Sequence, residues 1–201
     1  METLINKNDS FFVAGHNGMV GSAIVRCLLK NGYGEPIKGG KLFIPERKNL
    51  DLLNYEKVLS WFKKNRPNVV ILAAAKVGGI ISNDKYPFNF LSENLRIQQN
   101  VIESAWLTGT KRLLFLGSSC IYPKNSNQPI REEELLTNSL EETNEAYAIA
   151  KISGIKLCEA LRKQYKFDAI SVMPTNIYGP GDNYHSSDSH VFASFLRRFI
   201  E

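Results

Sequence analysis

A tyrosine and a lysine four residues apart, Tyr147 and Lys151, stand near the start of a stretch with helical periodicity. Four-residue spacing places both side chains on one face of a helix. An ammonium beside a phenol favours the phenolate and lowers the tyrosine pKa, so Tyr147 would exchange a proton with a carbonyl oxygen near neutral pH. Ser118, which follows a short apolar run, would supply a second hydrogen bond to that oxygen. The three residues together predict proton transfer at a carbonyl group.

A glycine-rich turn forms a second candidate site, because it follows the apolar run 11–14 and precedes an apolar helical stretch. In this context Gly15 allows a tight turn, Gly18 lets the backbone approach a pyrophosphate, and Gly21 permits close packing of helix and strand. The Gly-x-x-Gly-x-x-Gly spacing differs from Gly-x-Gly-x-x-Gly, and a turn without a ligand is the alternative. The predicted cofactor residues here are Gly15, His16, Asn17, Gly18, Met19, Val20 and Gly21.

The residues after the second predicted strand bear on which dinucleotide is bound. An NAD site would place an acidic residue there for the ribose hydroxyls, whereas this chain has Glu46, Arg47 and Lys48. Two basic residues favour a 2′-phosphate, so we predict NADP and assign Arg47 to the site. Glu46 leaves NAD open, and solvation alone would also explain two basic loop residues.

These candidate sites require a scaffold, and the chain alternates apolar, β-rich runs with helical patterns. Strands are predicted at 11–14, 42–44, 69–72, 112–116 and 169–173, and helices at 21–31, 55–65, 88–106, 144–165 and 190–200. Parallel strands joined by right-handed helical crossovers give a sheet covered on both faces. We therefore predict an α/β, Rossmann-like doubly wound parallel sheet. The aperiodic segment 118–143 follows a strand's carboxyl end, where such sheets bind ligands.

Composition limits the classes of protein that fit. The 201 residues, 43% of them hydrophobic, suit one domain, and no stretch approaches the roughly 20 apolar residues that span a bilayer. Three cysteines without paired spacing indicate free thiols in a reducing compartment, so a cytoplasmic protein is expected. The net charge is +5, but acidic residues lie between the basic ones; neither a nucleic-acid nor a membrane partner is predicted, and no metal site.

Several segments resemble the extended short-chain dehydrogenase/reductase family and, within it, the GDP-L-fucose synthase branch, whose members are GDP-4-keto-6-deoxymannose 3,5-epimerases and 4-reductases. The likeness covers nearly the whole chain, and several of its motifs are specific to this branch. The matching segments are 14–21, 72–80, 116–124, 143–151, 172–180 and 189–191.

The resemblance implies a set of catalytic residues and a GDP-sugar substrate. A C4 ketone acidifies the hydrogens on C3 and C5, and Ser118 and Tyr147 suit the enolate oxygen. Cys120 and His190 match the groups that move protons on opposite faces of the sugar. The implied catalytic set is Ser118, Cys120, Tyr147, Lys151 and His190.

The resemblance also extends the binding sites. Arg198 would approach the substrate diphosphate, and further cofactor contacts are expected from Lys151 and His190. The nicotinamide side would be lined by Leu116, Gly117, Ser118, Ser119, Pro174, Thr175, Asn176 and Ile177. Residues 1–201 are expected to form the NADP-binding domain, apparently truncated before a C-terminal substrate domain. A homodimer through the helices at 88–106 and 144–165 is also implied.

Two rival hypotheses stand beside this one. Another nucleotide-sugar epimerase, dehydratase or reductase would share the fold, although a 4-epimerase would not need the Cys120 and His190 pair. A non-catalytic dinucleotide-binding module would also share it, because the fold alone does not specify catalysis. The intact set of Ser118, Tyr147 and Lys151 argues against that module.

Overall fold

Five parallel strands form a single sheet in the order β2-β1-β3-β4-β5. The chain is known from a computed structural model, which describes residues 5–185, 189 and 191–201, apart from the side chain of Lys38. The strands are β1 (Ser10–Ala14), β2 (Lys41–Phe43), β3 (Val69–Leu72), β4 (Arg112–Leu116) and β5 (Ala169–Val172). Each prediction is confirmed to within one residue at either end.

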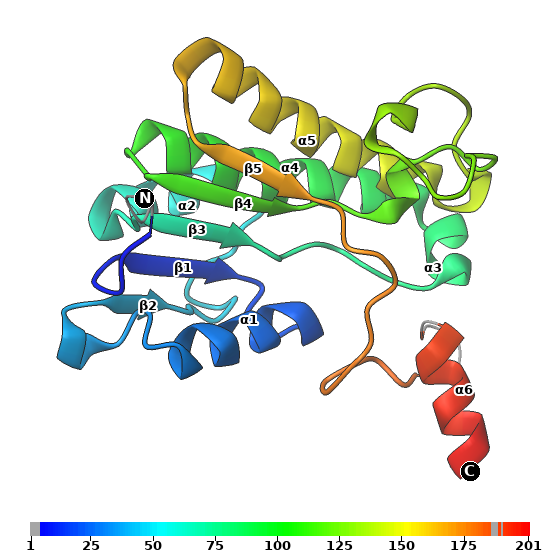
Figure 1. The fold of residues 1–201 in the computed structure, drawn as a ribbon, viewed down its shortest axis with the longest axis horizontal. Coiled ribbons are helices and arrows are strands. Elements are labelled where there is room, and N and C mark those ends of the chain that lie inside the picture. Colours follow the sequence, from blue (N-terminus) through cyan, green and yellow to red (C-terminus); the bar gives the residue numbers. More distant parts are fainter. Residues whose placement is uncertain (1–4, 186–188, 190) are drawn as a thin grey trace.

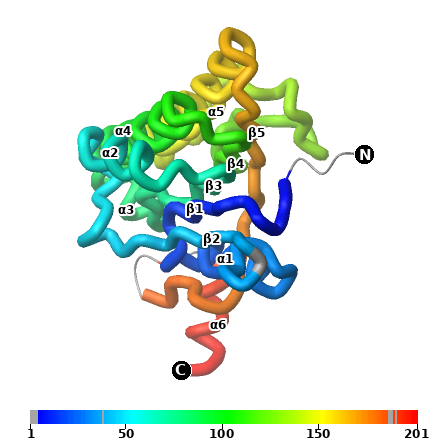
Figure 2. Tube along the Cα trace, turned by 90° about the vertical axis from the view of Figure 1, so that its left-hand side faces the viewer, coloured from blue at the N-terminus to red at the C-terminus, as the bar shows by residue number. Residues whose placement is uncertain are grey.

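Within the described residues, six α-helices accompany the sheet: α1 (Met19–Lys30), α2 (Tyr55–Asn65), α3 (Ile80–Lys85), α4 (Pro87–Leu107), α5 (Glu145–Tyr165) and α6 (Val191–Ile200). Figure 1 shows α2, α4 and α5 side by side on one face of the sheet and α1 on the other, and Figure 2 gives the same arrangement from the side. The chain steps outward from β1 to β2 and then returns past β1 to β3, which places the intervening helices on opposite faces. The doubly wound fold is confirmed.

Local sequence signals explain where the helices begin and end. Asn54 caps α2, since its side-chain oxygen accepts a hydrogen bond of 2.9 Å from the Lys57 amide. Arg66 ends the same helix in the left-handed conformation, and Lys166 does so for α5. Helix α1 begins at Met19, two residues before its predicted start, and α3 was not predicted. Six residues are too few to show a helical period.

The core lies between the sheet and the layer of α2, α4 and α5. Strands β1 and β3 are almost fully buried, as expected of central parallel strands. Phe12 of β1 packs against Trp61 and Phe62 of α2, with ring centroids 4.6 Å and 5.6 Å apart. These aromatic contacts fix α2 on the centre of the sheet.

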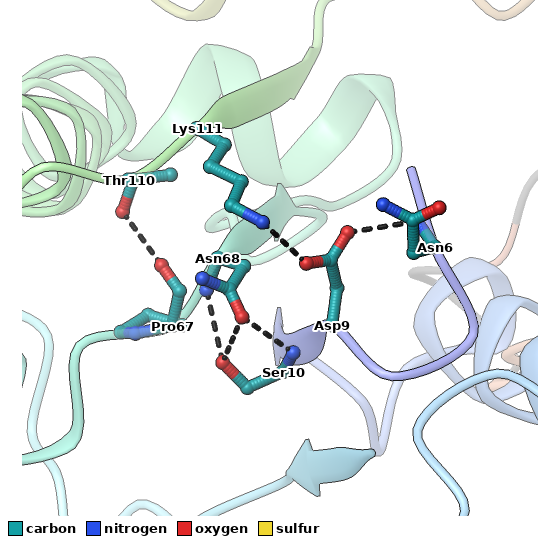
Figure 3. Close-up of polar contacts among 7 residues, drawn as sticks. All are labelled: Asn6, Asp9, Ser10, Pro67, Asn68, Thr110 and Lys111. Carbon is teal, nitrogen blue, oxygen red and sulfur yellow. Dashed lines mark hydrogen bonds and ion pairs between the residues drawn. The ribbon is translucent and has the colours of Figure 1, made fainter. Parts of the chain in front are cut away.

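Polar contacts tie together the amino ends of β1, β3 and β4 (Figure 3). The carboxylate of Asp9 is 4% exposed, lies 2.7 Å from the Lys111 ammonium and accepts a 2.8 Å hydrogen bond from the Asn6 amide. Next to it, the Ser10 hydroxyl lies 2.9 Å from the Asn68 side-chain oxygen. Loops lie at the opposite side of the sheet, at the carboxyl ends of the strands.

The segment 118–143, expected to be irregular and functional, follows β4 at that carboxyl edge. It contains the short 3-10 turns η2 (Ser119–Ile121) and η3 (Glu132–Glu134), and η4 (Glu142–Asn144) leads into α5. Lys124 closes the segment on itself, because its ammonium lies 2.9 Å from the Glu141 carboxylate and its amide donates to the Ser139 carbonyl. No helix in the described part of the chain is long and apolar enough to cross a membrane.

Candidate active site

The first turns of α5 present Tyr147 and Lys151 on the face that covers β4. Lys151 is only 4% exposed, and its ammonium donates a 2.7 Å hydrogen bond to the Leu116 carbonyl at the end of β4. The same nitrogen lies 5.0 Å from the centre of the Phe115 ring and 5.8 Å from that of Tyr147. The four-residue spacing therefore brings both side chains to one strand end, as predicted.

Ser118 and Cys120 reach the same place from β4. Ser118 caps the turn η2, where its hydroxyl oxygen accepts a 3.3 Å hydrogen bond from the Cys120 amide. The Ser118 hydroxyl lies near enough to the Tyr147 phenol to lower its pKa, and Cys120 lies close enough for its charge to act on that phenol. Four of the five predicted catalytic residues thus converge. The fifth, His190, lies outside the described residues.

The electrostatics of the pair differ from the expectation. Burial, the largest effect, and the negative charge of Cys120 raise the pKa of Tyr147 to about 12, although the Ser118 hydrogen bond lowers it. Burial lowers the pKa of Lys151 to about 8. The prediction that Lys151 depresses the tyrosine pKa was wrong, because desolvation dominates and the ammonium is bonded to the Leu116 carbonyl. A protonated Tyr147 at neutral pH is suited to donating a proton.

The glycine-rich turn lies across the sheet, after β1. Gly15 has a φ of +87°, and a Cβ at this position would lie 2.6 Å from the Ala74 amide nitrogen, so only glycine fits. At Gly21 a Cβ would lie 2.1 Å from the Gly15 carbonyl oxygen. Gly18 is the N-cap of α1 and no side chain caps that helix, so its first-turn amides are available to an anion.

Arg47 and Lys48, the residues that suggested NADP, behave differently. The Lys48 ammonium lies 2.7 Å from the Glu46 carboxylate, so these two charges neutralise each other. Arg47 is exposed, and no ion pair of its side chain is found within the described ranges. Arg47 is therefore the cation of this loop that is left for a phosphate.

The residues expected beside the nicotinamide lie where β4 and β5 end. The Gly117 amide donates to the Val172 carbonyl at 2.8 Å, and the Ser119 amide to the Pro174 carbonyl at 3.3 Å. Leu116 is the last residue of β4. Thr175 and Asn176, which follow β5 in the chain, are exposed. Ile177 borders an apolar hollow of about 300 Å³. Its opposite wall is formed by Met19, Val20 and other residues of α1.

The remaining predicted site residues are His16 and Asn17, expected at the cofactor, and Arg198, expected at the substrate. His16 is half-buried and Asn17 exposed in the turn. Arg198 is exposed in the last turn of α6, and none of the described contacts joins it to the catalytic residues. Figure 1 shows α6 beyond the carboxyl edge of the sheet, apart from α5.

Asn94 of α4 is a site residue that sequence reasoning missed. Its amide is 2% exposed and pairs with the backbone of Lys76 in both directions, accepting from the nitrogen at 2.8 Å and donating to the oxygen at 3.0 Å. Phe90, one turn earlier, lies against the Tyr147 ring. Asn94 thus fixes the loop after β3, whose residue Ala74 touches Gly15. A buried amide on the apolar face of a predicted helix was the available signal.

Comparison with known proteins decides the family. The model of the NAD dependent epimerase/dehydratase family matches residues 11–201. The chain belongs to this family. The match includes both the glycine-rich turn and the convergent residues of β4 and α5, so the epimerase/dehydratase fold carries both halves of the candidate site.

Individual relatives from the epimerase/dehydratase family show a more specific similarity. GDP-L-fucose synthase 1 of Arabidopsis thaliana is 54% identical over the whole chain and 60% of its own length. GDP-L-fucose synthase of Escherichia coli (strain K12) is 53% identical over 94% of the chain and 57% of its own length. A solved GDP-L-fucose synthetase from Naegleria fowleri bound to NADP is 28% identical, with a TM-score of 0.85 over 96% of this chain and 62% of that one. The chain spans about 60% of the length of the curated relatives it matches.

Proposed function

We propose that residues 1–201 form the NADP-binding, catalytic domain of an enzyme that makes GDP-L-fucose from GDP-4-keto-6-deoxymannose by 3,5-epimerisation and 4-reduction. The convergence of Ser118, Cys120, Tyr147 and Lys151 at the carboxyl ends of the strands carries the proposal. The names of relatives more than 50% identical to the chain support the substrate. The substrate lobe would lie beyond Glu201, in the part of the relatives that this chain does not span.

The glycine-rich turn fits a dinucleotide in shape and in charge. Gly15 and Gly21 leave no room for side chains, so the backbone closes tightly, and the uncapped first turn of α1 offers amides to a pyrophosphate. Arg47 would meet the 2′-phosphate. When bound there, NADPH would supply a hydride for C4 of the sugar.

The protein groups would then handle the protons. The Ser118 hydroxyl and the Tyr147 phenol would donate hydrogen bonds to O4, which stabilises the negative charge that develops there during both epimerisation and reduction. Cys120, beside that phenol, would exchange the proton on one face at C3 and C5, and His190 would act on the other. Because burial keeps its pKa at about 12, Tyr147 would deliver its proton to O4 as the hydride arrives.

We further propose that the protein is a cytoplasmic homodimer that pairs through α4 and α5. A hollow of about 300 Å³ lies between these helices, and Leu95, Trp106 and Leu157 line it. Half-buried apolar side chains there would be covered by a second copy. Sedimentation equilibrium should give a dimer that Leu95→Glu converts to a monomer; a monomeric parent chain would contradict the pairing.

The function is tested by turnover in heavy water with NADPH and GDP-4-keto-6-deoxymannose, using the gene product with its substrate lobe. We expect NADPH loss with deuterium at both C3 and C5. Cys120→Ser should lose most of the exchange, whereas Cys27→Ser, an exposed thiol elsewhere, should not. Reduction without exchange in the parent protein would remove the roles of Cys120 and His190. NADPH binding without turnover would point to another nucleotide sugar.

A further inference from the structure

Helix α4 bonds the catalytic helix at one buried point. Gln98 is 4% exposed, and its side-chain amide donates a 2.6 Å hydrogen bond to the carbonyl of Ala150, which is fully buried. Ala150 directly precedes Lys151 in α5. The bond therefore holds α5 at the turn that carries the lysine.

A glycine lies in α5 one turn beyond Lys151, on the same face of the helix. A Cβ at Gly154 would lie 2.5 Å from Cζ of Phe115 and 2.8 Å from the side-chain oxygen of Gln98. Such distances are far inside van der Waals contact, so a side chain here requires the Phe115 ring, the Gln98 side chain or α5 itself to move. Glycine inside a helix costs about 1 kcal/mol relative to alanine, and here that cost permits the close approach.

The distance between α5 and β4 matters because it decides which groups the Lys151 ammonium contacts. Its ammonium bonds the Leu116 carbonyl at 2.7 Å and lies 5.0 Å from the ring of Phe115, the same ring that fills the space above Gly154. A helix displaced outward by an added methyl group would draw the ammonium off this carbonyl and let water in.

We propose that Gln98 and Gly154 are positioning residues for the catalytic helix: they set how closely α5 lies on β4 and so hold the Lys151 ammonium on the Leu116 carbonyl. Neither residue touches the reacting groups. The mechanistic meaning rests on the proposed function, in which Lys151 belongs to the converging set of residues, but the geometry can be tested without cofactor or substrate.

The helices offer matched controls. Asn100, also on α4 and 8% exposed, donates a similar 2.8 Å bond to the Leu52 carbonyl, remote from α5. Ser153, beside Gly154, lines the hollow between α4 and α5, and its hydroxyl bonds its own helix at the Ile149 carbonyl. Replacing these residues removes comparable interactions without changing the approach of α5 to β4.

The test is the titration of Lys151 in the 201-residue chain, followed by NMR of Cε and Nζ with isotope-labelled lysine and assigned with Lys151→Arg. Burial places the pKa of Lys151 at about 8, against an ordinary 10.5, so its midpoint reports how well the ammonium is kept from water. Tyr147, the titratable group whose ring lies 5.8 Å away, has its pKa raised to about 12 and does not titrate in this range.

Gln98→Met and Gly154→Ala should each move the midpoint upward by about one pH unit or more, as Lys151 regains water. Asn100→Leu and Ser153→Ala should leave it unchanged. If Gln98→Met fails to fold, Gly154→Ala, which removes no hydrogen-bonding group, tests the same contact. An unchanged midpoint in a folded Gly154→Ala or Gln98→Met variant would overturn the proposal, and so would an equal movement in Asn100→Leu.

Discussion

Replacing Lys151 by methionine should change how the stability of the chain depends on pH. The lysine is 4% exposed, and burial lowers its pKa from 10.5 to about 8. That difference corresponds to about 3 kcal/mol by which the folded state disfavours the ammonium at neutral pH. Methionine keeps much of the length and packing of the side chain but has no charge.

The sign follows from proton linkage. Between pH 8 and 10.5 the unfolded state still binds the Lys151 proton and the folded state has released it, so the free energy of unfolding rises with pH. Relative to Lys151→Met, the parent chain should gain about 2 kcal/mol between pH 7 and pH 9.5. Any packing or hydrogen-bond loss in the variant is the same at every pH and does not alter this slope.

Urea unfolding at several pH values, followed by circular dichroism, measures the effect. Lys156→Met is the control, because Lys156 lies on the same helix but is half exposed and paired with Glu159. We expect the free energy of unfolding of this control to change with pH almost as it does in the parent chain. Parallel curves for Lys151→Met as well would refute the argument that the Lys151 ammonium is desolvated.

Three further changes test the cofactor turn and the far edge of the sheet. Arg47→Ala should weaken NADPH binding about tenfold in fluorescence titrations and leave NADH binding unaffected. Lys48→Ala should weaken NADPH binding less, because Lys48 is paired with Glu46. Equal losses of affinity for both cofactors in Arg47→Ala would contradict a phosphate contact. Gly21→Ala should destabilise the chain by about 1–3 kcal/mol or more in thermal melting, because its Cβ would strike the Gly15 carbonyl, and an unchanged melting temperature would disprove the clash. Asp9→Ala should cost about 1 kcal/mol, because the Asn6 backbone amide and the exposed Lys111 ammonium lose their acceptor. NADPH affinity should stay the same; a weaker affinity would show that the amino and carboxyl ends of the strands are coupled.

Most of the fold could be predicted from the sequence, because the patterns that indicate strands and helices are local. Strand β3 and helix α2 have the predicted bounds, since a short apolar run and an apolar face with a 3.6-residue period each specify one element. Helix α3 escaped prediction because six residues carry too little pattern. The start of α1 was misplaced because the helix begins inside the glycine-rich turn.

The sequence predicted which residues of α5 and the end of β4 lie together, but not the pKa values of those residues. Spacing and strand ends brought Ser118, Tyr147 and Lys151 together, which depends only on helix period and parallel topology. Their pKa values depend on burial, which comes from packing of distant residues such as Phe115 and could not be read from spacing. The supporting amides Asn94 and Gln98 act across the fold, so only their place on an apolar helix face hinted at them.

The order of strands has a consequence for how the chain is made. Strand β1 leaves the ribosome before the other four strands of the sheet but lies inside it, between β2 and β3, with Ala14 paired to Leu72. At roughly 5–20 residues per second, several seconds of translation separate β1 from its second neighbour. During that interval β1, whose residues Phe11, Phe12 and Val13 are almost fully buried in the finished fold, has at least one unpaired edge. The apolar residues of β1 therefore remain open to non-native pairing until β3 has been synthesised.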